Sequence, residues 1–268
     1  MTLQLLSLHV YPVKSCRGLS PARWRVGRRG LLYDREWMVT DEGGRFLSQR
    51  EEPRMALIGT DFRDGGLVLE APGMAELPAA ALVPGAEGEG EVWEDRVRVE
   101  DQGEAAAAWL TAFLGRPCRL VRAALSFRRD VLLGGQVVAE DGVAFADAFP
   151  FLVLGEASLR DLNGRLPRPV AAERFRPNLV VAGAAPYAED RWRRIRIGTV
   201  EFDLVKPCAR CTIPAVDPET GERGREPLAT LAAYRRREGK LYFGVNAIHR
   251  GEGLLTAGDG VEVLEEAP

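Results

Sequence analysis

Residues 206–221 read KPCARCTIPAVDPETG and carry the most concentrated chemical signal in the chain. Two cysteines, Cys208 and Cys211, are separated by two residues at the end of an expected strand. Such a pair can belong to a structural zinc site, to a redox dithiol or to a thiolate site for a soft metal. It can also consist of two small buried hydrophobic residues without a chemical role.

The rest of the sequence weakens the first two interpretations. A structural zinc site needs four nitrogen or sulfur ligands, usually from a second pair, and the remaining cysteines and histidines are isolated at positions 9, 16, 118 and 249. A thioredoxin-type dithiol should open a helix, but two prolines and a turn follow here. The motif alone leaves two interpretations open. In one, a thiolate kept deprotonated by Arg210 binds the metal of an organic cofactor; in the other, both cysteines are inert.

Composition and charge exclude several classes of protein. The chain has 268 residues, of which 46% are hydrophobic and 28% charged, and no apolar run reaches the ~18 to 20 residues of a membrane span. We therefore expect neither a disordered chain, a collagen-like rod nor a membrane protein. The net charge of -3 offers no bulk positive field for nucleic acid or anionic lipid, so local charge must hold any anionic ligand.

Cysteine usage and the N-terminal sequence favour a reducing, cytoplasmic environment. Four unevenly spaced cysteines are too few for a disulfide framework in a chain of this length. The start, MTLQLLSLHVYPVKSC, places its apolar run before the charge and lacks a small-residue cleavage signal. That pattern does not predict a secretory signal.

Short alternating or β-branched runs between turn residues predict a mainly β, α+β fold. Their spacing in residues 1–100 predicts a small β-barrel or sandwich, in which residues 78–91 form a surface loop. A domain boundary is expected near residue 100, giving domains 1–100 and 101–268. Later strands are expected in NLVVAG, RRIRIGTVEFDLV, KLYFGVNAI and GVEVLEE.

Three helices are expected among these strands. Asp101 and Glu104 resemble an N-cap and its reciprocal N3 acid ahead of AAAAWLTAFL, and Gly115 is a stop signal. The other two are predicted over residues 156–166 and 227–236; in the latter, apolar residues recur at three-residue steps. Because strand and long helix do not alternate regularly, a parallel α/β sheet is not expected.

Further motifs surround the cysteine pair: YPVKSCRG, LLYDREWMV, FLSQREEPRMALI, FPFLVLGEASLRDLN, ERFRPNLVV, REPLATLAAYR and LYFGVNAI. Together with KPCARCTIPAVDPETG they resemble, in the same order, the molybdenum cofactor sulfurase C-terminal (MOSC) family. More narrowly, the chain is similar to the branch that contains the mitochondrial amidoxime-reducing components and their bacterial relatives. The resemblance extends from about residue 3 to residue 264 and decides between the two open interpretations.

This resemblance implies an N-terminal MOSC β-barrel region packed on a MOSC β-barrel domain, with a molybdenum cofactor (Mo-molybdopterin) held between them. In the family's C-x-R-C motif the second cysteine binds the metal, which assigns that role to Cys211 and none to Cys208. Ala209 offers its backbone and Arg210 its charge to the cofactor. Pyridoxal phosphate binding is a further association of the family. The family's contacts in YPVKS, D-R-x-W and F-R-P-N fall on Lys14, Ser15, Arg35, Arg176 and Asn178.

Other positions depart from the family pattern or allow more than one role. The stretch FADAFPF has Ala148 and Phe149 where relatives can have small hydroxyl residues, so backbone contacts and a more apolar substrate pocket are expected. Asp147 matches the family and is a candidate proton donor or substrate-orienting group, with loop capping as the alternative. Asn246 stands where some relatives have tyrosine, and its amide can bind pterin or phosphate.

The chemistry of a pterin phosphate supports these assignments. It is a compact dianion, which a lysine, a serine hydroxyl and an arginine fork can neutralise together. Each basic residue has an alternative role. Lys14 is otherwise a solvated charge, and Arg176 an ion pair with Glu173. Arg35, which strand alternation places on one face with Trp37, stacks on the pterin or on that indole.

The resemblance implies an oxidoreductase that reduces small N-hydroxylated substrates, such as amidoximes, hydroxylamines or N-hydroxylated base analogues. Cys211 and Asp147 are the candidate catalytic residues. No cysteine cluster follows residue 211 and no Gly-rich dinucleotide fingerprint occurs. Electrons are therefore expected from a separate ferredoxin, flavodoxin or cytochrome with its reductase. The stretch YRRRE (234–238) is either a docking patch for an acidic carrier or a solvated helix end.

A non-catalytic role is the main alternative. Some family members are fused to sulfurases, so the chain can instead be a carrier of cofactor or sulfur that uses Cys211 as a persulfide. Zinc-stabilised folding is a third possibility. His9 is expected to be structural, and His249 receives no role.

Overall fold

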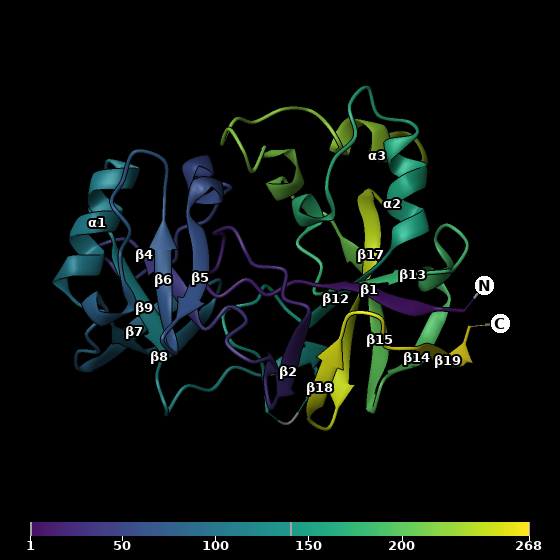
Figure 1. The fold of residues 1–268 in the computed structure, drawn as a ribbon, viewed down its shortest axis with the longest axis horizontal. Coiled ribbons are helices and arrows are strands. Elements are labelled where there is room, and N and C mark those ends of the chain that lie inside the picture. The colour runs from purple at the N-terminus through teal and green to yellow at the C-terminus, as the bar shows by residue number, and fades with distance from the viewer. Residues whose placement is uncertain (1, 140, 268) are drawn as a thin grey trace.

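The computed structural model describes residues 2–139 and 141–267. It confirms the mainly β fold, with 41% of the residues in strands and 16% in helices. Figure 1 shows two β-rich bodies side by side. The first body contains α1 (Glu104–Leu114), and the second contains the largest sheet, beside which both ends of the chain lie.

An eight-stranded sheet forms most of the second body. Its order is β1 (Gln4–Leu8), β13 (Leu179–Ala182), β12 (Phe151–Gly155), β17 (Lys240–Arg250), β15 (Val200–Ala209), β14 (Trp192–Ile197) and β19 (Val261–Glu266), with β16 (Arg236–Arg237) paired to β17. Neighbouring strands are antiparallel except β12 and β13. The long strands β15 and β17 pair with each other, and the KPCARC segment lies at the end of β15.

A smaller sheet helps to enclose the core of the second body. Its order is β18 (Gly253–Thr256), β2 (Arg23–Gly27) and β3 (Gly30–Leu31). Along β15, Val200, Phe202 and Leu204 alternate with more exposed residues, which is the two-residue period of a strand with one buried face. Phe202 packs against Phe151 with ring centroids 5.0 Å apart. Apolar alternation therefore defines this core.

The first body combines a four-stranded sheet, a hairpin and α1. The sheet order is β4 (Trp37–Thr40), β9 (Arg119–Ala123), β8 (Asp95–Asp101) and β7 (Glu87–Val92), and the hairpin is β5 (Gly59–Arg63) with β6 (Gly66–Glu70). Leu110 and Phe113 of α1 share a buried core with Trp37 and Met55.

The packing of the first body continues beyond residue 100. The helix α1 belongs to its core, and β9 pairs with both β4 and β8. In the other direction, β1 pairs with β13 and β2 pairs with β18, so the beginning of the chain belongs to the second body. The two bodies thus exchange segments, and the boundary expected near residue 100 stays a prediction.

Two local predictions are wrong. Residues 87–91, expected as the end of the loop 78–91, belong to β7 and pair with β8. A Cβ at Gly90 would lie 3.0 Å from Met38 and 3.2 Å from Val99, so packing rather than propensity selects this strand. Asp101 is not the N-cap of α1. Gly103 takes that position, and its backbone N–H donates to Asp101 Oδ1 at 2.7 Å.

The other two predicted helices form as α2 (Glu156–Asn163) and α3 (Leu228–Tyr234), and Gly115 ends α1 in the left-handed conformation. Short elements complete the fold: η1 (Pro53–Leu57), η2 (Ala79–Ala81), η3 (Ala172–Phe175), η4 (Ala188–Asp190), η5 (Ile213–Ala215) and the hairpin β10 (Val131–Leu133) with β11 (Gln136–Ala139). In the described part of the chain, no helix has the length and apolar character needed to cross a membrane.

Gly18 lies where a side chain would collide with its neighbours. A Cβ there would sit 2.4 Å from the carbonyl oxygen of Val10 and 2.5 Å from the Tyr11 ring. We predict that Gly18→Ala lowers the free energy of unfolding by about 1–3 kcal/mol, measured by urea denaturation. In the control Gly88→Ala, nothing lies within 4 Å of the new Cβ, and the change should stay within about 0.5 kcal/mol. Equal losses in both variants would contradict this steric explanation.

Candidate functional site

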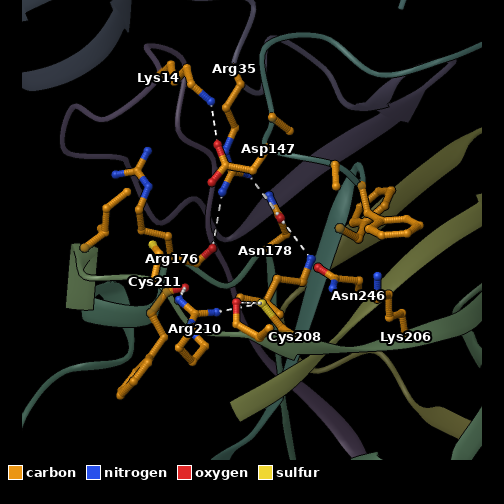
Figure 2. Close-up of a pocket in the computed structure, with 18 of the residues that line it drawn as sticks. Lys14, Arg35, Asp147, Arg176, Asn178, Lys206, Cys208, Arg210, Cys211 and Asn246 are labelled. Carbon is orange, nitrogen blue, oxygen red and sulfur yellow. Dashed lines mark hydrogen bonds and ion pairs between the residues drawn. The ribbon is translucent and has the colours of Figure 1, made fainter. Parts of the chain in front are cut away.

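A pocket of about 280 Å³ opens where the end of β15 meets the N-terminal loop and the loop before β12. Figure 2 shows side chains from these segments and from β17 turned toward one another. All twelve site residues predicted from the sequence line this pocket: Lys14, Ser15, Arg35, Asp147, Ala148, Phe149, Arg176, Asn178, Ala209, Arg210, Cys211 and Asn246. Their individual roles stay predictions.

Lys14 is buried in the pocket wall and is not a solvated charge. Its Nζ lies 2.5 Å from Asp147 Oδ1 and donates to the carbonyl oxygen of Phe145 at 2.8 Å. The same ammonium lies 5.1 Å from the ring centroid of Phe46 and 5.6 Å from that of Trp93. Burial lowers the pKa of Lys14, and the charge of Asp147 opposes that shift.

Asp147 accepts hydrogen bonds from two cations. Besides Lys14, Arg50 donates through Nη2 to Oδ2 at 2.8 Å. Burial by itself would raise the pKa of Asp147, but Lys14 and Arg50 outweigh it and hold the pKa well below its usual range. The group is therefore a carboxylate at neutral pH. A proton donor works best with a pKa near the working pH. This arrangement therefore favours a role for Asp147 as the charge partner of Lys14 and Arg50.

Arg35 does not follow the predicted strand alternation. It lies in a turn before β4 in the left-handed conformation, with φ 52°. Its guanidinium stacks over the ring of Tyr11, 4.5 Å from the centroid. The cation over Trp37 is Arg122, at 4.7 Å. The alternative in which Arg35 stacks on Trp37 is therefore wrong, because the turn directs Arg35 toward the pocket.

Hydrogen bonds tie Arg35 to the F-R-P-N motif. It donates through Nη1 to Asn178 Oδ1 at 3.1 Å and through Nη2 to the carbonyl oxygen of Arg176 at 3.2 Å. It also forms an ion pair with buried Asp34. Asn178 in turn donates to the carbonyl oxygen of His9 at 3.2 Å. Two motifs 141 residues apart in the sequence thus fix each other's geometry.

Arg176 has a buried donor without a partner. Its Nη1 donates to the carbonyl oxygen of Cys16 at 2.5 Å, whereas Nη2 is buried and finds no acceptor among the described residues. The alternative ion pair with Glu173 does not form there, because Glu173 lies 3.6 Å from His9 instead. Burial, reinforced by the charge of Arg35, lowers the pKa of Arg176 to about 10.

The guanidinium beside Cys211 comes from Arg50 and not from Arg210. Arg210 donates through Nη1 to Cys208 Sγ at 3.0 Å and through Nη2 to the carbonyl oxygen of Phe175 at 2.7 Å. Its Nε is buried without a partner in the described structure. Arg50 Nη2 lies 3.4 Å from Cys211 Sγ. The prediction that Arg210 assists Cys211 is therefore wrong, because its side chain turns toward Cys208.

The described residues do not favour the zinc or dithiol interpretations. They contain no group of three or more cysteine, histidine, aspartate and glutamate side chains that could hold a metal ion. Cys16 and Cys118 are buried in the core of the first body, and His9 hydrogen-bonds to Ser7 and Ser20. The cysteine pair ends a strand and does not open a helix. A metal already carried by an organic cofactor needs only one protein thiolate.

The remaining predicted residues shape the pocket wall. Ser15 is buried with φ 66°, and its carbonyl oxygen accepts from Gln49 Nε2 at 2.6 Å. Phe149 is buried in a small apolar cluster, and Ala148 is exposed. Ala148 and Phe149 thus add apolar surface to the pocket, and the more apolar substrate pocket expected from the sequence stays a prediction.

Sequence reasoning missed three contributors to the site. Lys206 lines the pocket beside Asn246, its register partner across β15 and β17, and both are labelled in Figure 2. Phe145 contributes its carbonyl oxygen, and Arg50 contacts Cys211. Lys206 begins the KPCARC segment, so its position in that motif could have indicated a place in the site. Arg50 stands in FLSQREEPRMALI, but no local pattern predicts a contact across 161 residues.

An excess of positive charge makes the pocket suitable for an anion. It is lined by five basic side chains against one carboxylate: Lys14, Arg35, Arg176, Lys206 and Arg210 against Asp147. The buried N–H groups Arg176 Nη2 and Arg210 Nε lack partners in the described structure, at a cost of about 1–3 kcal/mol each. A phosphorylated pterin would supply acceptors for them, and Cys211 offers a sulfur ligand in the same pocket. The residues present therefore fit a molybdenum-pterin cofactor.

Family comparisons agree with this geometry. The MOSC N-terminal beta barrel domain matches residues 2–117, and the MOSC domain matches residues 140–262. The chain belongs to the MOSC family. Both matches include pocket residues, since Lys14 and Arg35 lie in the first and Asp147 and Cys211 in the second. The site of this MOSC protein is thus assembled from both domains.

The relatives of the MOSC protein include amidoxime-reducing components and molybdenum cofactor sulfurases. The mouse mitochondrial amidoxime-reducing component 1 is 40% identical over 96% of this chain and 81% of its own length. The human protein of that name is 38% identical over 96% of this chain and 82% of its own length. A rice molybdenum cofactor sulfurase is 35% identical over 98% of this chain. The chain spans only about a third of that sulfurase, 35% of its length.

The Lys14–Asp147 pair makes a testable contribution to stability. Because the pKa of Asp147 is lowered in the folded protein, its contribution is present above the unfolded pKa of about 4 and is lost as the pH falls below it. Asp147→Asn leaves Lys14 buried without its charge partner. We predict that the variant loses about 1–3 kcal/mol of the free energy of unfolding at pH 7. Urea denaturation should show that this loss shrinks between pH 4 and pH 2. Asp130→Asn, at an exposed position outside the pocket, should show no such loss. A pH-independent loss would contradict the ion-pair explanation.

Proposed function

We propose that this chain is a molybdenum-cofactor-dependent oxidoreductase that reduces N-hydroxylated compounds. For an amidoxime the balanced reaction is R–C(=NOH)NH₂ + 2e⁻ + 2H⁺ → R–C(=NH)NH₂ + H₂O. The N–O bond breaks and the oxygen leaves as water. The observation that carries this proposal is the juxtaposition of Cys211 with a pocket of five basic side chains. The names of the amidoxime-reducing relatives support the reaction class.

In this proposal each part of the pocket has one task. Cys211 binds the metal, and the basic residues hold the phosphate and pterin of the cofactor. Arg35, Asn178 and the backbone of Arg176 form one hydrogen-bonded unit, so they present a rigid surface to the pterin. When bound, the cofactor supplies the two-electron chemistry that no amino-acid side chain provides.

The chain's own residues prepare the site for that chemistry. Arg50 donates toward Cys211 and Asp147, which places a positive charge on the Cys211 side of the pocket. Asp147 orients Lys14 and Arg50. Delivery of a proton by Asp147 requires a rise in its pKa when cofactor and substrate bind and displace water from the pocket.

Electrons reach the site from a separate protein in this proposal, a ferredoxin, flavodoxin or cytochrome with its reductase. The stretch YRRRE offers less free charge to such a carrier than its sequence suggests. Arg235 pairs with Asp190 at 2.6 Å, and Arg237 lies 4.0 Å from the same carboxylate. Arg236 is exposed. Tyr234 ends α3, and Arg236 and Arg237 form β16, so a solvated helix end describes only the start of this stretch.

A carrier function is the second candidate, because the sulfurase relatives align with nearly the whole chain. In that case Cys211 would hold a persulfide and no reduction of N-hydroxylated compounds would occur. The two proposals differ in a measurable quantity. The enzyme holds about one molybdenum per chain, whereas the sulfur carrier holds cyanide-releasable sulfur.

The cysteine pair provides a direct test of the proposed metal ligand. We expect Cys211→Ser, made in a host that synthesises molybdopterin, to lose molybdenum and N-hydroxy reductase activity. Cys208→Ser should keep most of both, because Cys208 contacts Arg210 and is not the proposed ligand. Metal content by elemental analysis and amidine formation by chromatography give the two measurements. Retention of both in Cys211→Ser would exclude the assignment.

Lys206 provides a test of the proposed phosphate and pterin contacts. It lines the pocket without an ion pair among the described residues, whereas Lys240 is exposed and does not line it. We predict that Lys206→Ala weakens cofactor binding roughly fivefold, about 1 kcal/mol for a partly screened charge. Lys240→Ala should have no effect. Pterin and molybdenum retained after dilution at two salt concentrations measure the difference, and equal retention in both variants would remove Lys206 from the site.

A further inference from the structure

A second cavity, of about 480 Å³, adjoins the cofactor pocket. Asp147 lines both cavities, and Arg50 lines the second. Arg50 Nη2 bonds to Asp147 Oδ2 at 2.8 Å and lies 3.4 Å from Cys211 Sγ. The inner wall of the second cavity is therefore formed by a side chain, Arg50, that contacts the proposed metal ligand.

Trp93 forms an unusual part of this cavity. It lies in the two-residue turn between β7 and β8, where Val92 pairs with Asp95, and it has φ 58°. Such turns favour asparagine or glycine, because a bulky residue in the left-handed region costs about 1–3 kcal/mol. The residue also remains 41% exposed. Neither backbone preference nor burial explains a tryptophan at this position. Its exposed indole surface is therefore a candidate for ligand binding.

The indole of Trp93 is held firmly in place. Phe46 packs against it with ring centroids 5.0 Å apart. The guanidinium of Arg50 lies 4.7 Å from the indole centroid, and the ammonium of Lys14 lies 5.6 Å from it. Cation–π and aromatic contacts of this kind orient a ring. Trp93 is thus a fixed aromatic platform whose exposed part is available to a ligand.

The inner wall offers a hydrogen bond that the protein does not use. Arg50 Nη1 is buried and has no acceptor among the described residues, although Nη2 is fully engaged. The cavity is lined by five carboxylates and three arginines, so its charge does not exclude a cationic ligand. The unpaired donor of Arg50 at the inner wall favours a ligand group with an oxygen acceptor.

We infer that this second cavity binds the organic part of the substrate. A planar, conjugated N-hydroxylated compound stacks on Trp93, and its N–O oxygen accepts a hydrogen bond from Arg50. This orientation directs the N–O bond toward Cys211. The catalytic consequence rests on the proposed function, whereas the binding of the aromatic group does not.

The experiment compares two amidoximes that differ only in the group attached to the amidoxime carbon. Benzamidoxime carries a phenyl ring, and acetamidoxime carries a methyl group. Isothermal titration calorimetry on the protein as purified from a host that synthesises molybdopterin gives a Kd for each. We expect Trp93→Ala to reduce the preference for benzamidoxime over acetamidoxime on the order of tenfold, the size of a lost aromatic contact. Trp93→Phe should restore most of that preference.

A matched tryptophan variant controls for general effects. Trp24 lines neither cavity and packs near Phe62 in another part of the molecule, so Trp24→Ala should keep the wild-type preference. If Trp93→Ala does not fold, Trp93→Leu keeps the bulk without the flat π-surface and should show the same loss. An unchanged preference in a folded Trp93→Ala or Trp93→Leu protein overturns the inference.

Steady-state kinetics separate this inference from the proposed function. For benzamidoxime, Trp93→Ala should raise KM on the order of tenfold with kcat changed less than twofold. A fall in kcat at constant KM would contradict a binding platform. If the wild-type protein holds no molybdenum and reduces neither compound, the proposed function fails, and the calorimetric preference still decides whether the cavity binds aromatic ligands.

Discussion

The carboxylate of Asp147 organises the site, because it neutralises two cations that come from distant parts of the first body. Lys14 follows β1 and Arg50 follows β4, and both converge on its two oxygens. A buried cation strongly destabilises the folded state unless it is paired. The ion pair therefore permits two positive charges around Asp147, and the position of Arg50 next to the Cys211 thiol depends on it.

Three of the other four positive charges of the pocket have no carboxylate partner among the described residues. Arg35 and Arg176 stack on the ring of Tyr11, 4.5 and 4.2 Å from its centroid, and only Arg35 has a carboxylate partner, Asp34. Buried donors without acceptors are rare in folded proteins and call for a functional explanation. A dianionic phosphate satisfies several of them at once. The binding of an anionic ligand thus explains the excess of positive charge in the pocket.

The sequence predicts the components of the site better than their contacts. Motifs such as YPVKS and F-R-P-N identify Lys14, Arg176 and their neighbours, because each motif is local. The contact between Arg50 and Cys211 spans 161 residues and depends on the packing of the two bodies. The strand β7 was missed for a related reason, since glycine and glutamate have low strand propensity and only its pairing with β8 makes it a strand.

The same packing connects ligand binding to the association of the two bodies. Arg223, which follows the KPCARC segment in sequence, donates to the carbonyl oxygens of Gln49 and Arg50. The segment that carries Cys211 thus also holds the loop that carries Arg50. A ligand bound between them stabilises this contact by mass action. Conversely, any loosening of the contact withdraws Arg50 from Cys211, while Arg35 and Asn178, which are hydrogen-bonded to each other, keep their geometry. The Cys211 side of the pocket is therefore more sensitive to the packing of the two bodies than the Arg35 side.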